Sequence, residues 1–568
     1  MSTMRERLSQ PAIVGGLTGL AFAVLVLGPA LAPGFVLHYD MVFVPDLALS
    51  PRTLGTDGAV PRAVPNDAVV AALSLVLPGW VVQKFLLLLV FVALGAGIGL
   101  ILKSVPGTIA ATAFACWNPW LAQRLEVGHW GYVLGYAALP WVVWAAQRAR
   151  HGGLRSYAQL GLVLVFASLT GSTGAVLALI ALTGVTLFER PRAWRAWAVG
   201  FVTTILISAT WWFPFLTAAS QHADPEGATA FAAQADTPLG VVGSVMSGGG
   251  IWNQAAWYPE RQSWFVAMFA LVVTVGAVVA LYRLASADTG LRGFAVAGIV
   301  SLIVATLAAL PVGRELLTFF VTNVPGGGLL RDAQKFAAPW VLAGALGIGL
   351  AITALGRHAG AAERRLSSLA LGASLVLPIM LLPSLAWGSN GSWQAVKYPA
   401  DMLAVAEEIE HAEVGSVAVF PWIQYRRYDW NNNRIVLDPW NRLLARDVII
   451  NDGLPLKNGR WIAGEDPRAA DISALLQTQK YLTPGLRSMG VRHVVLLTDQ
   501  PNQDVDASRI PGATLRYETA HMQWWDLGAV DAESRDAKTA DFTGWIIALI
   551  GLIGLGFVGV AATRRHEK

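Results

Sequence analysis

Residues 84–102 read KFLLLLVFVALGAGIGLIL, an apolar run in which Lys84, at its start, is the one charged side chain. A helix needs roughly 20 mostly apolar residues to cross a bilayer, so this run predicts a membrane span. Its Gly95-Ala-Gly-Ile-Gly99 cluster is not a phosphate loop, because small residues inside an apolar span let helices approach closely. The run therefore indicates a helix that packs against other helices within a membrane.

The whole chain has the same character. Of its 568 residues, 55% are hydrophobic and 14% are charged, whereas soluble proteins carry roughly 25% charged residues. An ordinary soluble protein is excluded. Further apolar segments bring the expected total to about twelve spanning helices: 11–33, 105–122, 131–147, 156–170, 173–188, 196–217, 264–282, 293–311, 337–356, 367–387 and 543–562.

Basic residues mark every second loop between these segments: Arg5, Arg7, Lys103, Arg148, Arg150, Arg155, Arg190, Arg192, Arg195, Arg283, Arg292, Arg357, Arg364, Arg365, Arg564, Arg565 and Lys568. The alternate loops are longer and richer in acids: 34–83, 123–130, 218–263, 312–336 and 388–542. Cytoplasmic loops are enriched in Lys and Arg, so the pattern predicts a multi-pass protein of the cytoplasmic (inner) membrane with both termini in the cytoplasm. The net charge of +4 does not indicate a nucleic-acid partner, because the basic residues are spread between apolar runs.

The first apolar run is not expected to be a cleaved signal peptide. Ala30-Leu-Ala32 offers a small-x-small pattern, but the run exceeds the ~7–15 residues of a signal core, and cleavage would break the charge alternation. Cys116, the single cysteine, lies in an apolar stretch. It supports neither a disulfide framework nor a thiolate metal site.

Residues 388–541 have mixed polarity and are long enough for one α/β domain. Expected strands are Ser416–Phe420, Arg434–Leu437 and His493–Leu497, and expected helices are Pro399–His411 and Ala469–Lys480. The predicted organisation is a membrane domain at 1–387, an extracytoplasmic α/β domain at 388–541, and a final spanning helix with a basic tail at 542–568. Aromatic side chains in 425–430 and 438–442 suit either sugar stacking or anchoring at a membrane interface.

The first outer loop opens with His38-Tyr39-Asp40 and continues to Asp46. A carboxylate that is partly solvated at a membrane surface can keep a raised proton affinity and serve as a general base. The alternative is that Asp40 only caps the following turn.

Glu126 and His129 lie one helical turn apart if their segment is helical, so both could face one acceptor or metal site. Two ligands do not make a metal site, and a hydrogen-bonded interfacial pair is the alternative.

The loop Val324-Pro-Gly-Gly-Gly-Leu-Leu-Arg-Asp-Ala-Gln-Lys-Phe336 combines three glycines with Arg331 and Lys335. Exposed backbone amides and two cations at i, i+4 where a helix begins would cradle a phosphate. The alternatives are that both cations snorkel to lipid headgroups, or that Arg331 pairs with Asp332.

Several short motifs resemble the membrane part of the GT-C glycosyltransferases, above all the N-terminal region of the large mycobacterial arabinofuranosyltransferases. They are Asp40 after the first helix, the stretch from Asn66-Asp67 through Pro78-Gly79-Trp80 to Gln83-Lys84, Ala138-Leu-Pro-Trp141, and Leu329-Leu-Arg-Asp-Ala-Gln-Lys-Phe336. The resemblance covers roughly residues 10–390. The long C-terminal carbohydrate-binding region of those enzymes has no counterpart in this sequence.

The resemblance implies an inverting transferase acting outside the cytoplasmic membrane. It assigns the catalytic carboxylate to Asp40, with Asp46 as the second candidate, and the donor phosphate to Arg331 and Lys335. The implied donor is a polyprenyl-phosphate sugar, arabinofuranose or mannose, and the implied acceptor is a cell-envelope glycan or glycolipid. A divalent cation could assist phosphate departure, as in some members of the superfamily, although no convincing ligand set is visible.

Two other function classes fit parts of the pattern. A lipid-linked glycan transporter or flippase is one, although ion-coupled carriers place ionisable residues within the membrane and the apolar cores carry none well inside them. A non-catalytic GT-C-like scaffold in cell-wall assembly is the other, since a fold does not imply a function.

Overall fold

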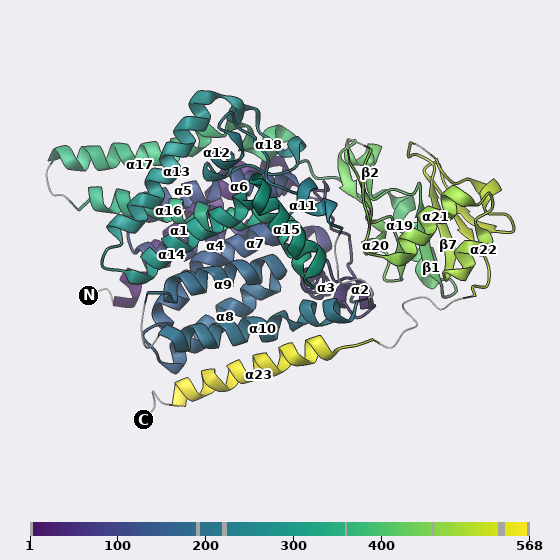
Figure 1. Cartoon of the computed structure of the whole chain (residues 1–568), viewed down its shortest axis with the longest axis horizontal. Helices are drawn as coiled ribbons and strands as arrows, with labels where there is room; N and C mark the ends of the chain where they lie inside the picture. Colours follow the sequence, from purple (N-terminus) through teal and green to yellow (C-terminus); the bar gives the residue numbers. More distant parts are fainter. Residues whose placement is uncertain are drawn as a thin grey trace.

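The computed structural model describes residues 4–188, 193–218, 224–357, 361–456, 459–501, 503–531 and 540–564. A large helical part lies beside an α/β domain, and the last helix returns from that domain along the helical part (Figure 1). Some basic residues of the loop alternation, Arg190, Arg192, Arg565 and Lys568, lie outside the described residues.

The helical part combines long helices with short ones in the loops. The long helices are α1 (Met4–Leu27), α4 (Gly79–Leu102), α5 (Val105–Cys116), α7 (Trp130–Ala149), α8 (Leu154–Leu169), α9 (Ser172–Thr186), α10 (Ala193–Thr217), α13 (Trp264–Leu284), α14 (Thr289–Thr306), α15 (Pro311–Asn323), α16 (Ala338–Leu355), α17 (Ala361–Leu381) and α23 (Thr543–Arg564). The short ones are α2 (Pro51–Leu54), α3 (Asn66–Ser74), α6 (Pro119–Glu126), α11 (Glu226–Ala230), α12 (Gly240–Met246) and α18 (Ala386–Gly391).

Within the described residues, seven helices are long and apolar enough to cross a membrane: Gln10–Leu31, Gly79–Leu102, Ala193–Thr217, Trp264–Leu284, Thr289–Ala309, Ala333–Leu355 and Thr543–Thr563. An eighth is added if Arg365–Leu381 and Pro383–Gly391, which meet at an 80° bend, form one span. The helices α8 and α9 are apolar but shorter. The chain is therefore a helical membrane protein, and the expected number of twelve spans is not confirmed.

The expected span 105–122 is not one continuous helix, because the helix is interrupted inside it. Helix α5 ends at Cys116, and α6 begins at Pro119. The Asn118 side chain accepts a hydrogen bond from the Leu121 amide (3.0 Å) and donates one to the Ala115 carbonyl oxygen (2.8 Å), so it closes one helix and caps the next.

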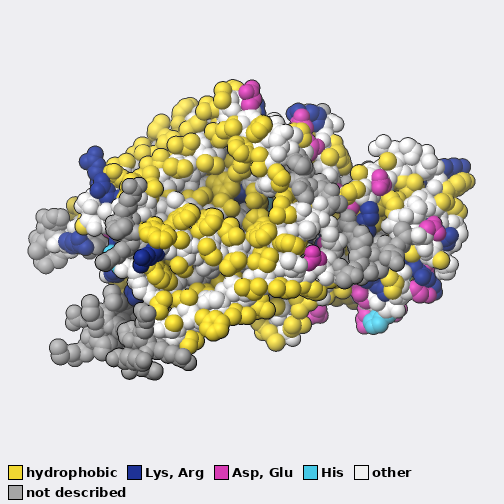
Figure 2. Space-filling view, turned by 60° about the horizontal axis from the view of Figure 1, so that its bottom comes forward, with side chains coloured by type: hydrophobic (Ala, Val, Ile, Leu, Met, Phe, Trp, Pro, Cys, Tyr) yellow, Lys and Arg dark blue, Asp and Glu magenta, His cyan; other side chains and the backbone are white. Residues whose placement is uncertain are grey.

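The glycines of the opening sequence bring α4 against α1, as predicted. A Cβ at Gly95 would lie 1.9 Å from the Gly15 carbonyl oxygen, and one at Gly99 would lie 2.3 Å from the Pro11 carbonyl oxygen. Only glycine fits at these two positions, because a larger residue would clash with the backbone of α1. On the face shown in Figure 2, apolar side chains cover most of the helical part, whereas charged side chains gather toward its ends and over the α/β domain.

The α/β domain is built on a mixed sheet of order β4-β1-β7-β9-β8, in which β1 is parallel to β4 and β7, and β9 is antiparallel to β7 and β8. Its strands are β1 (Ser416–Phe420), β4 (Val448–Ile449), β7 (Val491–Leu497), β8 (Thr514–Glu518) and β9 (Met522–Asp526); the pairs β2 (Tyr425–Arg427) with β3 (Ile435–Leu437) and β5 (Leu454–Pro455) with β6 (Trp461–Ile462) stand apart. Its helices are α19 (Ala400–His411), α20 (Trp440–Leu443), α21 (Pro467–Thr478) and α22 (Thr483–Ser488).

Alternate residues of β1 face two different cores. Val417 and Val419 belong to the large core that includes α19, whereas Ala418 and Phe420 pack in a smaller core with α21 and α22. The predicted strands at Ser416–Phe420, Arg434–Leu437 and His493–Leu497 are present with small shifts of their ends, as are the two predicted helices.

The first loop of the helical part joins this domain edge to edge. Phe35 bridges to Val396, and Tyr39 bridges to Val436 of β3. Arg442 of α20 forms an ion pair with Asp67 of α3 at 3.0 Å. These contacts place the loop that carries Asp40 between the helices and the domain.

Candidate functional site

Asp40 lies in a tight turn that its neighbours hold in place. The preceding residue, Tyr39, has φ of +44°, in the left-handed region that residues other than glycine rarely adopt. The Tyr39 amide donates to the Ile435 carbonyl oxygen (2.6 Å), and the Asp40 amide donates to the Val127 carbonyl oxygen (3.2 Å). Such strained residues persist only where surrounding structure fixes them, and they cluster at functional sites.

The segment after α6 packs directly on this turn. Gly128 has φ of +78°, and a Cβ there would lie 2.2 Å from the Met41 nitrogen. The His38 ring is buried, with Nε2 2.8 Å from the Leu125 carbonyl oxygen. The position of Asp40 therefore depends on glycine at 128 and on the end of α6.

Two side chains from distant parts of the sequence bind the Asp40 carboxylate. The Tyr425 hydroxyl, from β2 of the α/β domain, donates to Oδ1 at 2.6 Å, and His129 Nε2 lies 3.2 Å from Oδ2. The Asp40 side chain is still 40% exposed. It is thus oriented on both oxygens while remaining accessible.

The expectation that Asp40 has a raised proton affinity is wrong. Burial alone would raise the pKa of the Asp40 carboxyl, but the hydrogen bonds from His129 and Tyr425 act against it, and the pKa lies below its ordinary value. Asp40 is therefore ionised at neutral pH. It also does more than cap a turn, because both oxygens have side-chain partners.

His129 connects Asp40 to the glycine-rich loop. Arg124 Nη1 lies 3.0 Å from His129 Nδ1. An arginine only donates, so Nδ1 accepts and Nε2 carries the proton shared with Asp40. The fully buried Arg124 also binds both oxygens of Asp332 and the side chain of Gln334.

Lys335 lies just beyond this relay, in a 3-10 turn before α16. Its side chain is 3% exposed, and Nζ stands 5.3 Å from the ring centres of Tyr132 and Phe336. Tyr132 in turn packs against the ring of His129, with centroids 4.6 Å apart. Among the described residues, no carboxylate lies within ion-pair distance of Lys335.

Arg331 lies in the same loop but faces the α/β domain. Its Nη1 is 3.2 Å from Glu465 Oε1, and its guanidinium stands over the Phe231 ring at 5.3 Å. Glu465 also binds Arg62 of the first loop at 2.9 Å. The alternative in which Arg331 pairs with Asp332 is wrong, because Arg124 binds both oxygens of Asp332.

Glu126 and His129 do not converge on one site. Helix α6 ends at Glu126, so the assumed helical spacing is lost. Glu126 Oε2 accepts from Trp393 Nε1 (3.1 Å) and the Tyr258 hydroxyl (3.4 Å), and burial raises its pKa, whereas His129 faces Asp40. Across the part of the chain that the structure describes, no three His, Cys, Asp or Glu side chains gather as a metal site requires.

Asp46 is exposed and lines a cavity with Phe35 and Trp80. It shares none of the partners of Asp40. The structure thus brings Asp40, His129 and Lys335 together and leaves Asp46 and Glu126 apart from them.

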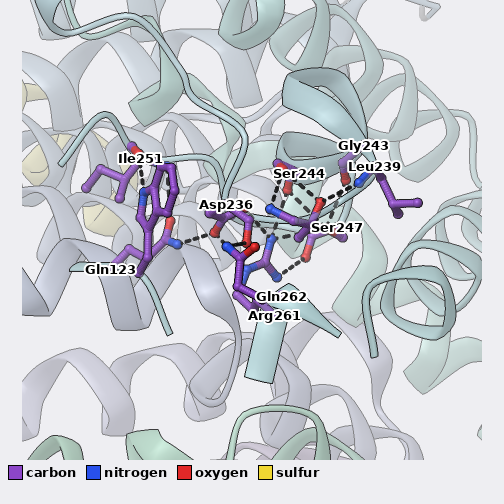
Figure 3. A network of polar contacts seen from close by, with 12 residues as sticks. Gln123, Asp236, Leu239, Gly243, Ser244, Ser247, Ile251, Arg261 and Gln262 are labelled. Atoms are coloured by element: carbon purple, nitrogen blue, oxygen red, sulfur yellow. Dashed lines mark hydrogen bonds and ion pairs between the residues drawn. The ribbon is translucent and has the colours of Figure 1, made fainter. Parts of the chain in front are cut away.

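A second polar network is centred on Asp236 and Arg261, and Gln123 of α6 takes part in it (Figure 3). Arg261 binds Asp236 through Nε to Oδ2 (2.7 Å) and Nη2 to Oδ1 (3.0 Å), and both side chains are buried. Gln123 donates to Asp236 and accepts from the Ile251 amide at 3.2 Å. Because Gln123 directly precedes Arg124, one short helix holds both networks.

Sequence reasoning missed Tyr425 and Arg124 as parts of the site. In the sequence, Tyr425 stands out only as part of an aromatic stretch. Its contact with Asp40 depends on the bridge between Tyr39 and β3, which the sequence does not reveal. Arg124 carried a usable signal, because it is a basic residue in a loop predicted to lie outside.

No family model and no curated protein matches the sequence. The arrangement of the long helices, the loops over their ends and the adjoining α/β domain nevertheless has a counterpart in known structures. Two solved structures show it: arabinofuranosyltransferase AftD from Mycobacteria (17% identity, TM-score 0.55, 94% of this chain and 40% of that chain) and a mutant of the same enzyme (15% identity, TM-score 0.51, 94% and 42%). The resemblance drawn from the motifs is confirmed at the level of the fold, and the chain spans less than half the length of these relatives.

Proposed function

We propose that the chain is a membrane glycosyltransferase that moves a sugar, arabinofuranose or mannose, from a polyprenyl phosphate to a cell-envelope glycan or glycolipid. The observation that supports this most is the ionised, accessible Asp40, held by Tyr425 and His129 and joined through Arg124 to the loop of Arg331 and Lys335. A base and a cationic loop in one connected cluster are the two parts that this reaction needs.

In the proposed mechanism, Asp40 takes the proton of the acceptor hydroxyl as its oxygen attacks the anomeric carbon. The bond from that carbon to the phosphate oxygen breaks in the same step, so the anomeric configuration inverts. The leaving polyprenyl phosphate is stabilised by Lys335, which has no ion-pair partner among the residues that the structure describes, and by Arg331. Arg331 has to exchange Glu465 for the phosphate.

The direct test is transfer from a purified polyprenyl-phosphate arabinofuranose or mannose to a glycan acceptor, with the protein in nanodiscs. The expected product carries the sugar with inverted anomeric configuration, identified by NMR. Movement of the lipid-linked sugar across the bilayer without a new glycosidic bond would favour a transporter instead, and neither activity would favour a scaffold.

We further propose that residues 1–387 form the membrane domain and 542–568 return to the cytoplasm, with 388–541 outside the cytoplasmic membrane. Ser392 and Ser508 are exposed on the α/β side, and His151 is exposed between α7 and α8. Cysteines at 392 and 508 should react in intact cells with an impermeant thiol reagent, whereas His151→Cys should react only after lysis. The buried Cys116 provides a low background, and labelling of His151→Cys in intact cells would overturn the orientation.

A further inference from the structure

A cavity of about 400 Å³ opens between the first loop of the helical part, the end of α3 and the start of α4. This volume is within the roughly 300–1,000 Å³ of small-molecule sites. It is lined by Trp80, Asp46, the buried Phe35, and Ser74, whose hydroxyl has no hydrogen-bond partner among the described residues. None of these side chains belongs to the Asp40 cluster.

The backbone around the cavity is fixed. The Gly79 amide donates to the Pro45 carbonyl oxygen (2.8 Å), and a Cβ at Gly79 would lie 1.9 Å from the Val44 carbonyl oxygen. The Val36 amide donates to Gln83 Oε1 (2.9 Å), and Gln83 Nε2 donates back to the Val36 carbonyl oxygen (2.7 Å). The cavity is therefore formed before any ligand arrives, which lowers the entropic cost of binding.

The lining chemistry suits a sugar. A sugar ring has an apolar face of C–H groups, which packs on an aromatic ring, and an edge of hydroxyls that donate to acceptors. The partly exposed Trp80 supplies aromatic surface, and the exposed Asp46 carboxylate is acceptor-only when ionised. Ser74 can donate and accept, so it adds a second polar contact.

The cavity also lies beside the first residues of a helix that is long and apolar enough to span a membrane. Val76 and Leu77 on its rim are exposed, Val76 to 77%, and they directly precede α4, which is long and apolar enough to span. Asp46 lies six positions after Asp40, so the two are at most about 20 Å apart along an extended chain. A glycan a few residues long could occupy the cavity and Asp40 together, with a lipid anchor beside Val76.

We propose that this cavity binds a sugar residue of the acceptor, at a distance from the hydroxyl that is extended. Asp46 is then an acceptor-binding residue and not a second catalytic base. This inference rests on the proposed transferase function for its kinetic test, whereas binding of the sugar itself can be measured without turnover.

The kinetic test compares wild type with Asp46→Asn and Trp80→Ala on acceptors of one to six sugar residues, each free or lipid-anchored. Both variants should raise KM about ten- to a hundredfold for the longer acceptors, with kcat and the single-residue acceptor unchanged. A fall in kcat on every acceptor with Asp46→Asn would make Asp46 catalytic and overturn the proposal, as would unchanged KM throughout.

Free and anchored acceptors that respond alike identify glycan binding, and an effect confined to anchored ones identifies a glycolipid headgroup. Glu408→Gln, an exposed acid on α19, is the matched control.

A measurement of sugar binding without turnover separates the cavity proposal from the transferase proposal. Saturation-transfer NMR with methyl α-arabinofuranoside and methyl α-mannoside, on the full chain in nanodiscs, should show contact that weakens in Asp46→Asn and Trp80→Ala but not in Glu408→Gln. If this pattern appears while no acceptor is extended, the cavity is supported and the transferase function fails. If transfer occurs but sugar contact is equal in all variants, the cavity proposal fails alone.

Discussion

Asp40 and Asp236 are both carboxylates bound by side chains from distant loops, but only one of them is open to a substrate. Asp236 is fully buried, and Arg261 and Gln123 occupy its oxygens. Asp40 receives one partner on each oxygen and stays 40% exposed. A carboxylate has about four acceptor positions, so Asp40 keeps some for an incoming hydroxyl.

The difference indicates a division of roles along α6. Gln123 joins α6 to the Asp236 network. Arg124, the next residue of α6, joins the Asp40 cluster to the glycine-rich loop. The pKa of both carboxyls is lowered against burial, but by Arg261 for Asp236 and by His129 and Tyr425 for Asp40. Loss of the Asp236 network should therefore affect folding, and loss of the Asp40 cluster should affect turnover.

The largest expected effect on activity is that of Asp40→Asn. The amide keeps the shape but cannot take a proton, so kcat should fall by about 10²–10⁴-fold. The melting temperature should stay close to that of wild type, since Asp40 is partly exposed. Measured together, transfer rate and thermal melting check this, and wild-type turnover would remove Asp40 from the mechanism.

Asp236→Asn should show the opposite pattern. It leaves Arg261 buried without its counter-charge, which costs about 3–5 kcal/mol of stability. Thermal melting in nanodiscs measures the loss. The double variant Asp236→Asn with Arg261→Gln should lose less than the sum of the single variants, because no lone charge remains. A stable but inactive Asp236→Asn would contradict the assigned role.

Arg331→Lys tests the cationic loop. If Arg331 grips the donor phosphate through paired hydrogen bonds, Lys keeps the charge but not the geometry. Losing such a contact costs about 1.5–3 kcal/mol, so donor KM or kcat should worsen about ten- to a hundredfold. If Arg331 only snorkels to headgroups, Arg331→Lys should match wild type. Unchanged kinetics in both Arg331→Lys and Arg331→Ala would rule out the phosphate contact.

Tyr425→Phe should have the smallest effect. Its hydrogen bond helps to lower the pKa of Asp40, so without it that pKa rises. Asp40 must be ionised to act as a base, and activity is lost as the pH falls through its pKa. The acid limb of the kcat/KM profile should therefore move to higher pH, with less than about tenfold loss at neutral pH. An unmoved acid limb would show that Tyr425 does not tune Asp40.

Much of the fold was predictable because its signals are local. Long apolar runs predicted α4, α10, α13, α14 and α23, and short apolar runs in a region of mixed polarity predicted β1 and β7. The break at Asn118-Pro119 was missed, since composition outweighed a capping residue and a proline within an apolar segment. The number of spans also remains a prediction, because α8 and α9 are apolar but too short to be assigned as spans by length alone.

The site was predictable only in part. Asp40 and the loop of Arg331 and Lys335 stood out because charged residues beside apolar runs are unusual. The contacts that make them a site depend on register across the chain, such as Tyr425 reaching Asp40 through the Tyr39 bridge to β3. The prediction of a raised pKa for Asp40 is wrong because it rested only on the position of Asp40 at the membrane surface. It did not include Tyr425 and His129, which the fold brings against the carboxylate.

Helix α6 has eight residues, Pro119–Glu126, and its adjacent side chains Gln123 and Arg124 serve different networks. Consecutive residues of a helix point about 100° apart. One residue inserted before Gln123 would rotate both side chains out of reach of their partners at once. This short stretch should therefore tolerate substitution far better than a change in length, and related chains that keep the site should keep its spacing to Gly128.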